Sequence, residues 1–338
     1  MKLLIVTQKV DAADSNLGFF VRWIEEFARK CERIAVIANE VHKDAQGYMP
    51  DNVALFSLGK EDGASRVEKF RRYRKLLHEQ VPVSDRVFFH MCPEYVLVAG
   101  WLPRKHSKKT LLWYVHKEVN WKLYIAEKLV DKIFTASKES FRLKSNKVQV
   151  VGHGIDTDFF NNGTENAHGL HLVTAGRISP VKDLKTIIGG FLELKKKFGE
   201  ATLSIIGEPL TEGDCAYRDE LIRLFSESVR FKGGMTHKDL PRMYGAATVF
   251  LHASKTGSMD KAVLEALASG LTVFTSSEAF SEEIPGVFKF KQGNSEDLAK
   301  RICTSFLRGE IVYNEYGREW VKTHHDLRGL IKKIIDSF

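Results

Sequence analysis

The sequence predicts an α/β protein built from two doubly wound domains. Short apolar runs alternate with longer amphipathic stretches, a pattern typical of a parallel sheet covered by helices on both faces. The alternation stops at a polar segment, residues 161–169, and then restarts. With 338 residues the chain is also longer than one hydrophobic core usually supports.

In the first half, the apolar runs are interpreted as buried strands. They lie at residues 3–7, 34–38, 53–58, 86–90, 111–115, 132–136 and 148–151. Two segments, 18–31 and 67–79, have apolar side chains at helical spacing and are predicted to be helices. The Gly- and Asn-rich residues 161–169 are the predicted linker.

The second half repeats the pattern. Strands are predicted at residues 170–175, 201–206, 229–232, 249–253 and 272–276. Helices are predicted at 183–198, 217–226, 238–246, 261–269 and 295–307, followed by an amphipathic helical tail. We therefore predict a first domain over 1–163, a second over 164–315 and a C-terminal helix over 316–338. The crevice beside the strand ends of such domains is the expected binding site.

Composition limits the classes of partner. The net charge of +8 favours phosphates, nucleic acid or acidic membranes without choosing among them. The four cysteines, Cys31, Cys92, Cys215 and Cys303, lack zinc spacing and are interpreted as reduced, mostly buried thiols. No run of about 18 apolar residues exists to span a bilayer, and the apolar start is too short for a signal peptide. We expect a cytoplasmic protein, and peripheral attachment to the inner face of the plasma membrane stays open.

Two cations follow the first strand of the second half. Gly176 allows a sharp turn, Arg177 then leaves the strand end, and Lys182 precedes a helix. An Arg fork and a compact Lys charge suit phosphate oxygens, whereas two solvated surface cations are the plain alternative.

A second signal follows the strand at 249–253. Asp260 is predicted to cap a helix whose first N–H groups, from Gly257 through Ser258 and Met259 to Lys261, face a diphosphate. Glu265 lies one turn further in, within an apolar stretch, and is placed to accept hydrogen bonds from a ribose.

These segments resemble those of glycosyltransferase family 4, the retaining nucleotide-sugar enzymes of GT-B fold. The strings that carry the resemblance in the second half are TAGRISPVKD, LSIIGEP, VRFKGGMTHKDLPRMYGAATVFLHAS and VLEALASGLTVFTS. The first half is similar more loosely, through NLGFFVRWIEEFA, WYVH, FTAS and GHGIDTDFF. The resemblance implies two Rossmann-like domains facing across a cleft, with the C-terminal helix packing back on the first.

The resemblance also implies roles by position. Arg177 and Lys182 match the pair that grips the donor diphosphate, and Glu265 matches the second Glu of the E-x7-E motif, which binds the ribose. His116 matches a histidine near the donor sugar, and Gly18 a glycine of the loop that closes over diphosphate and acceptor. The segments containing Gly207 and Gly233 match those that flank the base.

The chain departs from the family at one position. Gly257 stands where the first Glu of the motif faces the donor sugar. This leaves the sugar open and allows an inactive homologue, although Asp260 could substitute through a rearranged loop.

Three other patterns have weaker functional interpretations. Asp156 and Asp158 form a D-x-D string, for which a structural turn is favoured over a metal site. His324 and His325 are adjacent on a helix and point in different directions, which disfavours a shared metal. The carboxylates of Asp11 and Asp14 could serve an acceptor hydroxyl or be ordinary loop residues.

Basic residues cluster in two places. They are Lys69, Arg71, Arg72, Arg74 and Lys75 on a helix, and Arg104, Lys105, Lys108 and Lys109. With Phe70, Tyr73, Leu76 and Leu77 the helix resembles an interfacial helix for anionic lipid, whereas a solvated face over an inward apolar stripe is the plainer interpretation. Nucleic acid fits poorly, because no recognition motif accompanies the charge.

Together these features predict a retaining hexosyltransferase. It would move sugar from a UDP- or GDP-linked donor to a hydroxyl of a glycan or lipid-linked glycan, without a metal or other cofactor. The alternatives are a GT-B nucleotide-sugar epimerase and a non-catalytic nucleotide-sugar-binding homologue.

Overall fold

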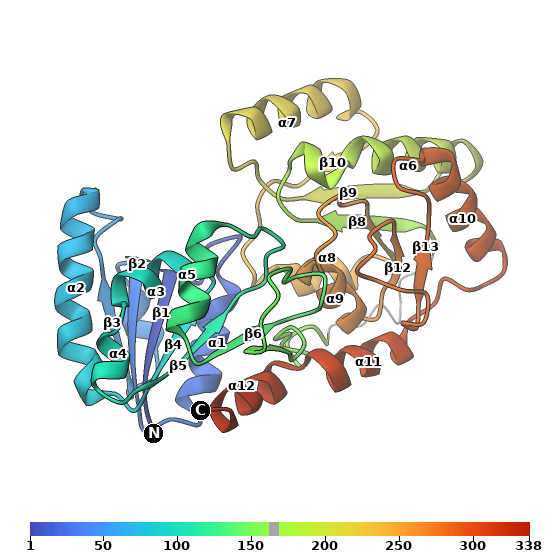
Figure 1. The fold of residues 1–338 in the computed structure, drawn as a ribbon. Helices are drawn as coiled ribbons and strands as arrows, with labels where there is room; N and C mark the ends of the chain where they lie inside the picture. The colour runs from blue at the N-terminus through green and yellow to red at the C-terminus, as the bar shows by residue number, and fades with distance from the viewer. Residues whose placement is uncertain (162–168) are drawn as a thin grey trace. The chain divides into compact units, whose positions relative to one another are not determined.

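The computed structural model describes residues 1–161 and 169–338, which form two compact units (Figure 1). The first unit contains Met1–Gly154 and Leu327–Phe338, and the second contains Ile155–Asp326. Most of the predicted linker, residues 162–168, lies outside the described residues. Because Leu327–Phe338 belongs to the first unit, the chain returns to that unit at its C-terminal end.

The first unit is built on a parallel sheet in the order β3-β2-β1-β4-β5-β6-β7. Its strands are β1 (Lys2–Val10), β2 (Arg33–Val41), β3 (Val53–Ser57), β4 (Arg86–His90), β5 (Lys109–Trp113), β6 (Lys132–Thr135) and β7 (Val148–Val150). All seven predicted strands are confirmed.

Both faces of this sheet are buried, because alternate strand residues point in opposite directions. On one face, Leu3 and Ile5 pack in a core with α1 (Phe19–Ala28) and α12 (Leu327–Asp336). On the other, Leu4 and Val6 pack in a core with further helices. Those helices are α2 (Arg66–Val83), α3 (Pro93–Ala99), α4 (Leu102–Lys105) and α5 (Trp121–Leu129).

The second unit has a parallel sheet in the order β10-β9-β8-β11-β12-β13. Its strands are β8 (His171–Ala175), β9 (Thr202–Ile206), β10 (Arg230–Phe231), β11 (Val249–His252), β12 (Thr272–Thr275) and β13 (Val287–Lys289). Residues of α6 (Leu184–Lys197), α7 (Glu212–Phe225) and α10 (Ser295–Leu307) share a core on one face. Residues of α8 (Leu240–Gly245), α9 (Lys261–Ala268) and α11 (Glu315–His325) share the core on the other.

The structure differs from the sequence prediction in short elements and in the tail. Helices α3, α4 and α5 and strand β13 are additional, because such short segments carry too few periods to be distinguished from loops. The prediction of a single helix in the C-terminal tail is wrong. The tail contains two helices, α11 and α12, separated at Asp326, where ψ is 138°.

Glycine turns tie the carboxyl ends of the second sheet together. Gly176 and Gly207 have φ of 140° and 147°, and the Gly176 N–H donates to the Ile206 carbonyl at 3.0 Å. A Cβ on Gly207 would overlap the Gly176 carbonyl oxygen. The loops after β8 and β9 can therefore touch only because Gly207 has no side chain.

Substitution of Gly207 tests this packing. We expect Gly207→Ala to lower the free energy of unfolding by about 1–3 kcal/mol, through backbone strain and displacement of the neighbouring loop. Urea unfolding measures the change. The control is Gly199→Ala, at an exposed glycine with nothing near its Cβ position. Equal effects of the two substitutions would contradict the packing argument.

Candidate functional site

The strongest candidate site lies at the carboxyl edge of the second sheet, between β8 and β11. The strand order reverses here, because β9 and β11 lie on opposite sides of β8. In open α/β sheets, ligands bind at such a switch point. The loop after β8 contains Lys182, and the loop after β11 contains Asp260.

Lys182 and Asp260 join the two loops. The Lys182 ammonium donates to the Asp260 carboxylate at 2.5 Å, and both side chains are mostly shielded from solvent. The Lys255 N–H donates to the Val181 carbonyl at 2.8 Å, a second link between the same loops. The structure therefore brings together two residues that are far apart in sequence but were both predicted for the donor site.

His252 completes this group from the end of β11. Its Nε2 lies 2.7 Å from the Asp260 carboxylate, and its Nδ1 lies 2.9 Å from the Thr275 hydroxyl. His252 and Thr275 are paired in the β11–β12 ladder, so the sheet itself fixes the ring. Burial alone would raise the pKa of Asp260, but the Lys182 charge and the His252 hydrogen bond outweigh it and hold that pKa well below its ordinary range.

One prediction for Asp260 is wrong. The residue occupies the N-cap position of α9, but its side chain makes no capping hydrogen bond. Its carboxylate is instead engaged by Lys182 and His252. An ammonium and an imidazole are stronger partners for a carboxylate than a peptide N–H, and both reach it here.

Glu265 sits in a second group of the same composition. It is buried in α9, and its carboxylate is 3.1 Å from the Lys261 ammonium and 3.3 Å from the His237 ring. The His237 ring stacks on Phe159 with centroids 5.3 Å apart. Burial would raise the pKa of Glu265, but Lys261 and His237 lower it to about 2. The carboxylate is thus an ionised acceptor at neutral pH.

The remaining residues predicted for the donor site of the second unit lie in the adjoining loops. Arg177 is half-buried, and its Nε lies 4.0 Å from Asp214, which belongs to the capping box of α7. The Gly207 N–H donates to the Gly233 carbonyl at 2.9 Å, and Gly233 has a left-handed φ of 70°. These contacts connect the loops after β8, β9 and β10, where the base-flanking segments were predicted.

The loop before Asp260 has a glycine conformation at position 257, where the resemblance implied a Glu. Gly257 is buried and has a φ of 65°, a conformation that favours glycine. Ser258 and Met259 follow it and are half-buried. A residue with a Cβ at position 257 would have a strained backbone. This loop conformation therefore favours the glycine that is present.

Two predicted residues belong to the first unit. Gly18 is the N-cap of α1, where a Cβ would approach the Asp14 carbonyl oxygen to 2.5 Å. His116 follows β5 and is exposed, with its Nδ1 accepting from the Glu118 N–H at 3.1 Å.

The carboxylates of Asp11 and Asp14 bind one lysine. The Lys9 ammonium contacts them at 3.3 and 2.9 Å and also contacts Glu40 at 2.7 Å. These ion pairs hold the loop between β1 and α1, in which Gly18 lies.

Sequence reasoning missed the histidines of the site. His252 and His237 each support one carboxylate, and His90 lies at the first unit's switch point, with Nδ1 3.0 Å from the Thr7 hydroxyl. The signal for His252 was a polar residue ending an otherwise apolar strand, Val249–His252. No local signal identifies His237, because its partner Glu265 is 28 positions away.

The competing patterns are structurally accounted for. Asp156 accepts from the Phe159 N–H at 3.1 Å, so the predicted turn is confirmed. His324 donates to the Trp320 carbonyl at 2.8 Å. The four cysteines are free, two of them buried and two half-buried.

The described residues contain neither a metal-binding cluster nor a membrane-spanning helix. Across residues 1–161 and 169–338, no group of three or more His, Cys, Asp or Glu is arranged to hold a metal ion. In that same part of the chain, no helix is long and apolar enough to cross a membrane.

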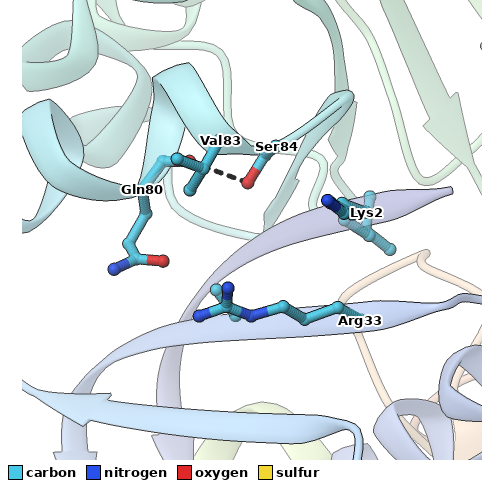
Figure 2. A pocket seen from close by; sticks show the side chains of 7 residues that line it. Lys2, Arg33, Gln80, Val83 and Ser84 are labelled. Atoms are coloured by element: carbon cyan, nitrogen blue, oxygen red, sulfur yellow. Dashed lines mark hydrogen bonds between the residues drawn. The ribbon is translucent and has the colours of Figure 1, made fainter.

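Two surface hollows lie away from these residues. One, of about 10 Å³, is shown in Figure 2 beside Lys2, Arg33 and Ser84, at the amino ends of β1 and β2. The other, of about 330 Å³, lies beside His171, Thr202 and Arg230, which start β8, β9 and β10. Both are at the amino edges of the sheets, opposite the edge where predicted site residues gather.

The ionised state of Glu265 predicts a dependence of stability on acid. The pKa of Glu265 in the folded state, about 2, lies below its ordinary value of 4.5. Between about pH 5 and pH 2 the unfolded chain therefore binds more protons than the folded protein does. Wild-type protein should lose stability across that window, and Glu265→Gln should lose less. Chemical unfolding at several pH values measures this, with exposed Glu200→Gln as control. Parallel profiles for wild type and Glu265→Gln would contradict it.

The loop at Gly257 should not accommodate a glutamate without strain. We expect Gly257→Glu to destabilise the protein by about 1–2 kcal/mol, the cost of a left-handed conformation for a residue with a Cβ. Thermal and urea unfolding report the change, and Gly199→Glu controls for the added charge. A neutral or stabilising Gly257→Glu would show that the loop readily adopts another conformation.

Part of the second unit is similar to a known protein family. Residues 169–306 match the profile of the family described as Glycosyl transferases group 1. No curated protein sequence matches the chain.

Solved structures match over both units. The HepE protein of Anabaena, solved in complex with UDP-glucose, has a TM-score of 0.75 at 16% identity, covering 100% of this chain and 99% of that one. A glycosyltransferase from Rickettsia africae has a TM-score of 0.75 at 13% identity, covering 99% and 97%. Sucrose-phosphate synthase from Thermosynechococcus elongatus also reaches 0.75, at 14% identity, covering 99% and 98%. The chain therefore has the GT-B fold of two Rossmann-like units, and part of its second unit is similar to the Glycosyl transferases group 1 family.

Proposed function

We propose that the protein is a retaining glycosyltransferase that moves a hexose-type sugar from a nucleoside-diphosphate sugar to a hydroxyl, without a metal. The acceptor is a glycan or lipid-linked glycan, and the reaction takes place in the cytoplasm. The observation that carries this proposal is the Lys182–Asp260 pair, which bridges the loops after β8 and β11 at the switch point.

The chemistry requires positive charge beside the leaving group. Breaking the anomeric bond puts positive charge on the sugar ring and negative charge on the departing diphosphate. Lys182, the half-buried Arg177 and the N-terminal N–H groups of α9 would stabilise that negative charge as it develops. Fixed donors of this kind lower a barrier by about 2.7–4 kcal/mol each.

Asp260 determines how Lys182 meets the donor. The Asp260 carboxylate neutralises the Lys182 ammonium at 2.5 Å. When a diphosphate binds, its oxygens compete for the same ammonium, and Asp260 keeps its hydrogen bond to His252. We assign Asp260 the task of holding Lys182 in position, and of facing the donor sugar in place of the Glu missing at 257.

Glu265 is assigned to the ribose. An ionised carboxylate accepts hydrogen bonds from two hydroxyl groups, and Lys261 and His237 keep it ionised despite burial. The loops containing Gly207 and Gly233 would flank the base. HepE, which was solved with UDP-glucose, supports a UDP sugar as the first donor to try.

The first unit would supply the acceptor side. His116 at the end of β5 would position the donor sugar, and the loop carrying Gly18 would cover the diphosphate. The departing phosphate itself takes the proton of the acceptor hydroxyl on the same face of the sugar, which gives retained configuration. Closure over the donor would exclude water and so limit hydrolysis.

The decisive experiment measures donor binding and turnover together. UDP, GDP and their common sugars are screened by thermal shift, where a ligand at a hundredfold excess over its Kd stabilises by about 2.7 kcal/mol. Lys182→Ala should lower turnover by roughly 10²–10³-fold, since it removes a charge from the leaving group. Glu265→Gln should weaken nucleotide binding measured by calorimetry.

The controls separate the possible outcomes. Lys185→Ala removes a neighbouring exposed lysine, paired with Glu220, and should leave donor turnover unchanged. Turnover should also survive chelation, and NMR of the product should show retained anomeric configuration. Loss of activity with chelator that manganese restores would contradict metal independence. Binding without turnover across all donors would favour a non-catalytic homologue, which the glycine at 257 also suggests, and sugar conversion by donor alone would favour an epimerase.

A further inference from the structure

We propose that the first unit docks on an anionic lipid surface through the outer face of α3, α4 and α5. Four large apolar side chains are exposed there. We call them the aromatic patch: Trp101 (60% exposed), Trp121 (63%), Tyr124 (54%) and Ile125 (43%). This inference does not depend on the proposed function.

Three members of the patch form a stripe on α5. Trp121, Tyr124 and Ile125 are spaced i, i+3 and i+4, so they share the outward side of the helix. The inward side is occupied by Leu123 and Ala126, which are buried in the core under the sheet. The stripe is therefore additional to the apolar face that holds α5 to the protein. Scattered apolar residues on a surface need no explanation, but a contiguous stripe marks an interaction site.

Trp101 extends the stripe at the other end of α5. The Arg104 guanidinium lies 4.6 Å from the centre of the Trp101 ring and donates to the Lys128 carbonyl at 3.1 Å. Lys128 is in the last turn of α5. One arginine therefore connects Trp101 to the carboxyl end of α5, the helix that carries the other three members of the patch.

Cations surround the patch, and carboxylates near it are neutralised. Arg104, Lys105 and Lys128 are exposed. The acidic residues of α3, α4 and α5 are Glu94 and Glu127, which contact Lys122 at 2.7 Å and Lys128 at 3.1 Å. The net charge that this face presents is positive.

Helix α2 adds more positive charge on the same side of the sheet. It contributes to the same core as α3 and α5, and its sequence RVEKFRRYRKLLHEQVPV has six Lys and Arg against two Glu. Its inward stripe is Tyr73, Leu77 and Val81, whereas Phe70 is 52% exposed. Of the two predicted interpretations, the inward stripe is confirmed for Tyr73 and Leu77, and Phe70 remains available to a surface.

This combination fits a lipid surface better than a soluble anion. Trp and Tyr favour the headgroup level of a bilayer, where the ring is shielded and the polar atom stays hydrated. Lysines and arginines at the same level are attracted to anionic headgroups. A polyanion such as nucleic acid would use the cations but leave Ile125 without a function.

Vesicle binding by the full chain, without donor or acceptor, tests the proposal. The chain should sediment with mixed phosphatidylcholine and phosphatidylglycerol vesicles, less with phosphatidylcholine alone, and less at high salt. Trp121→Ser/Tyr124→Ser/Ile125→Ser should weaken binding about tenfold or more, because it removes the apolar stripe. Lys105→Gln/Lys128→Gln should weaken binding only to the anionic vesicles.

Matched variants in the second unit serve as controls. Leu210→Ser/Leu307→Ser/Tyr316→Ser removes three apolar side chains that are at least as exposed as those of the stripe, and Lys197→Gln/Lys300→Gln removes the same charge as the lysine variant. Both should bind vesicles like the wild type. Circular dichroism and melting verify that every variant folds.

Tryptophan emission gives a second readout. It should shift to the blue when anionic vesicles are added, and the shift should shrink in Trp101→Phe/Trp121→Phe, which keeps the apolar surface and the binding. Absence of binding to anionic vesicles, or equal binding by the stripe variant, would overturn the proposal. A different result would also overturn it: the wild type is a dimer, the stripe variant is a monomer, and both bind vesicles equally. The patch would then bind a second copy of the chain. Because no nucleotide is present, none of these outcomes bears on the glycosyltransferase proposal.

Discussion

The candidate site depends on the ion pair between Lys182 and Asp260. Lys182 lies in the loop after β8 and Asp260 in the loop after β11, on either side of the switch point. The ion pair therefore connects two loops that lead to different helices. The pair also keeps the Lys182 ammonium charged in a partly buried position. A buried charge without a partner would cost folding free energy, and Asp260 provides that partner. A diphosphate entering this place meets a cation that is already positioned.

Histidines give the two carboxylates of the site their fixed positions. His252 holds Asp260 from the end of β11, and His237 holds Glu265 from the loop before α8. In both groups a lysine supplies the charge and a histidine supplies orientation, with Thr275 and Phe159 fixing the rings. Burial by itself would favour protonated carboxyls, and the lysines reverse that preference.

The proposed reaction assigns different tasks to the two units. The second unit carries the cations and carboxylates suited to a nucleotide, whereas the first carries His116, the Gly18 loop and a cationic aromatic face. If the acceptor is attached to lipid, a surface that holds the first unit at a membrane would bring acceptor and enzyme together. The two proposals support each other in that case, although each has its own test.

The sequence by itself determined the alternation of strands and helices and the two-part organisation, and it indicated the residues proposed for the donor site. These follow from local periodicity and from motifs contained in short segments, such as Gly176 to Lys182. Tertiary structure decided what those residues touch. It gave the Asp260 carboxylate to Lys182 and His252 instead of the helix cap, and it brought His237 to Glu265 from 28 positions away. It also divided α5 into a buried side and an exposed aromatic side. Such pairings arise when the sheet assembles, because strand order sets which distant loops meet, and no local pattern records that order.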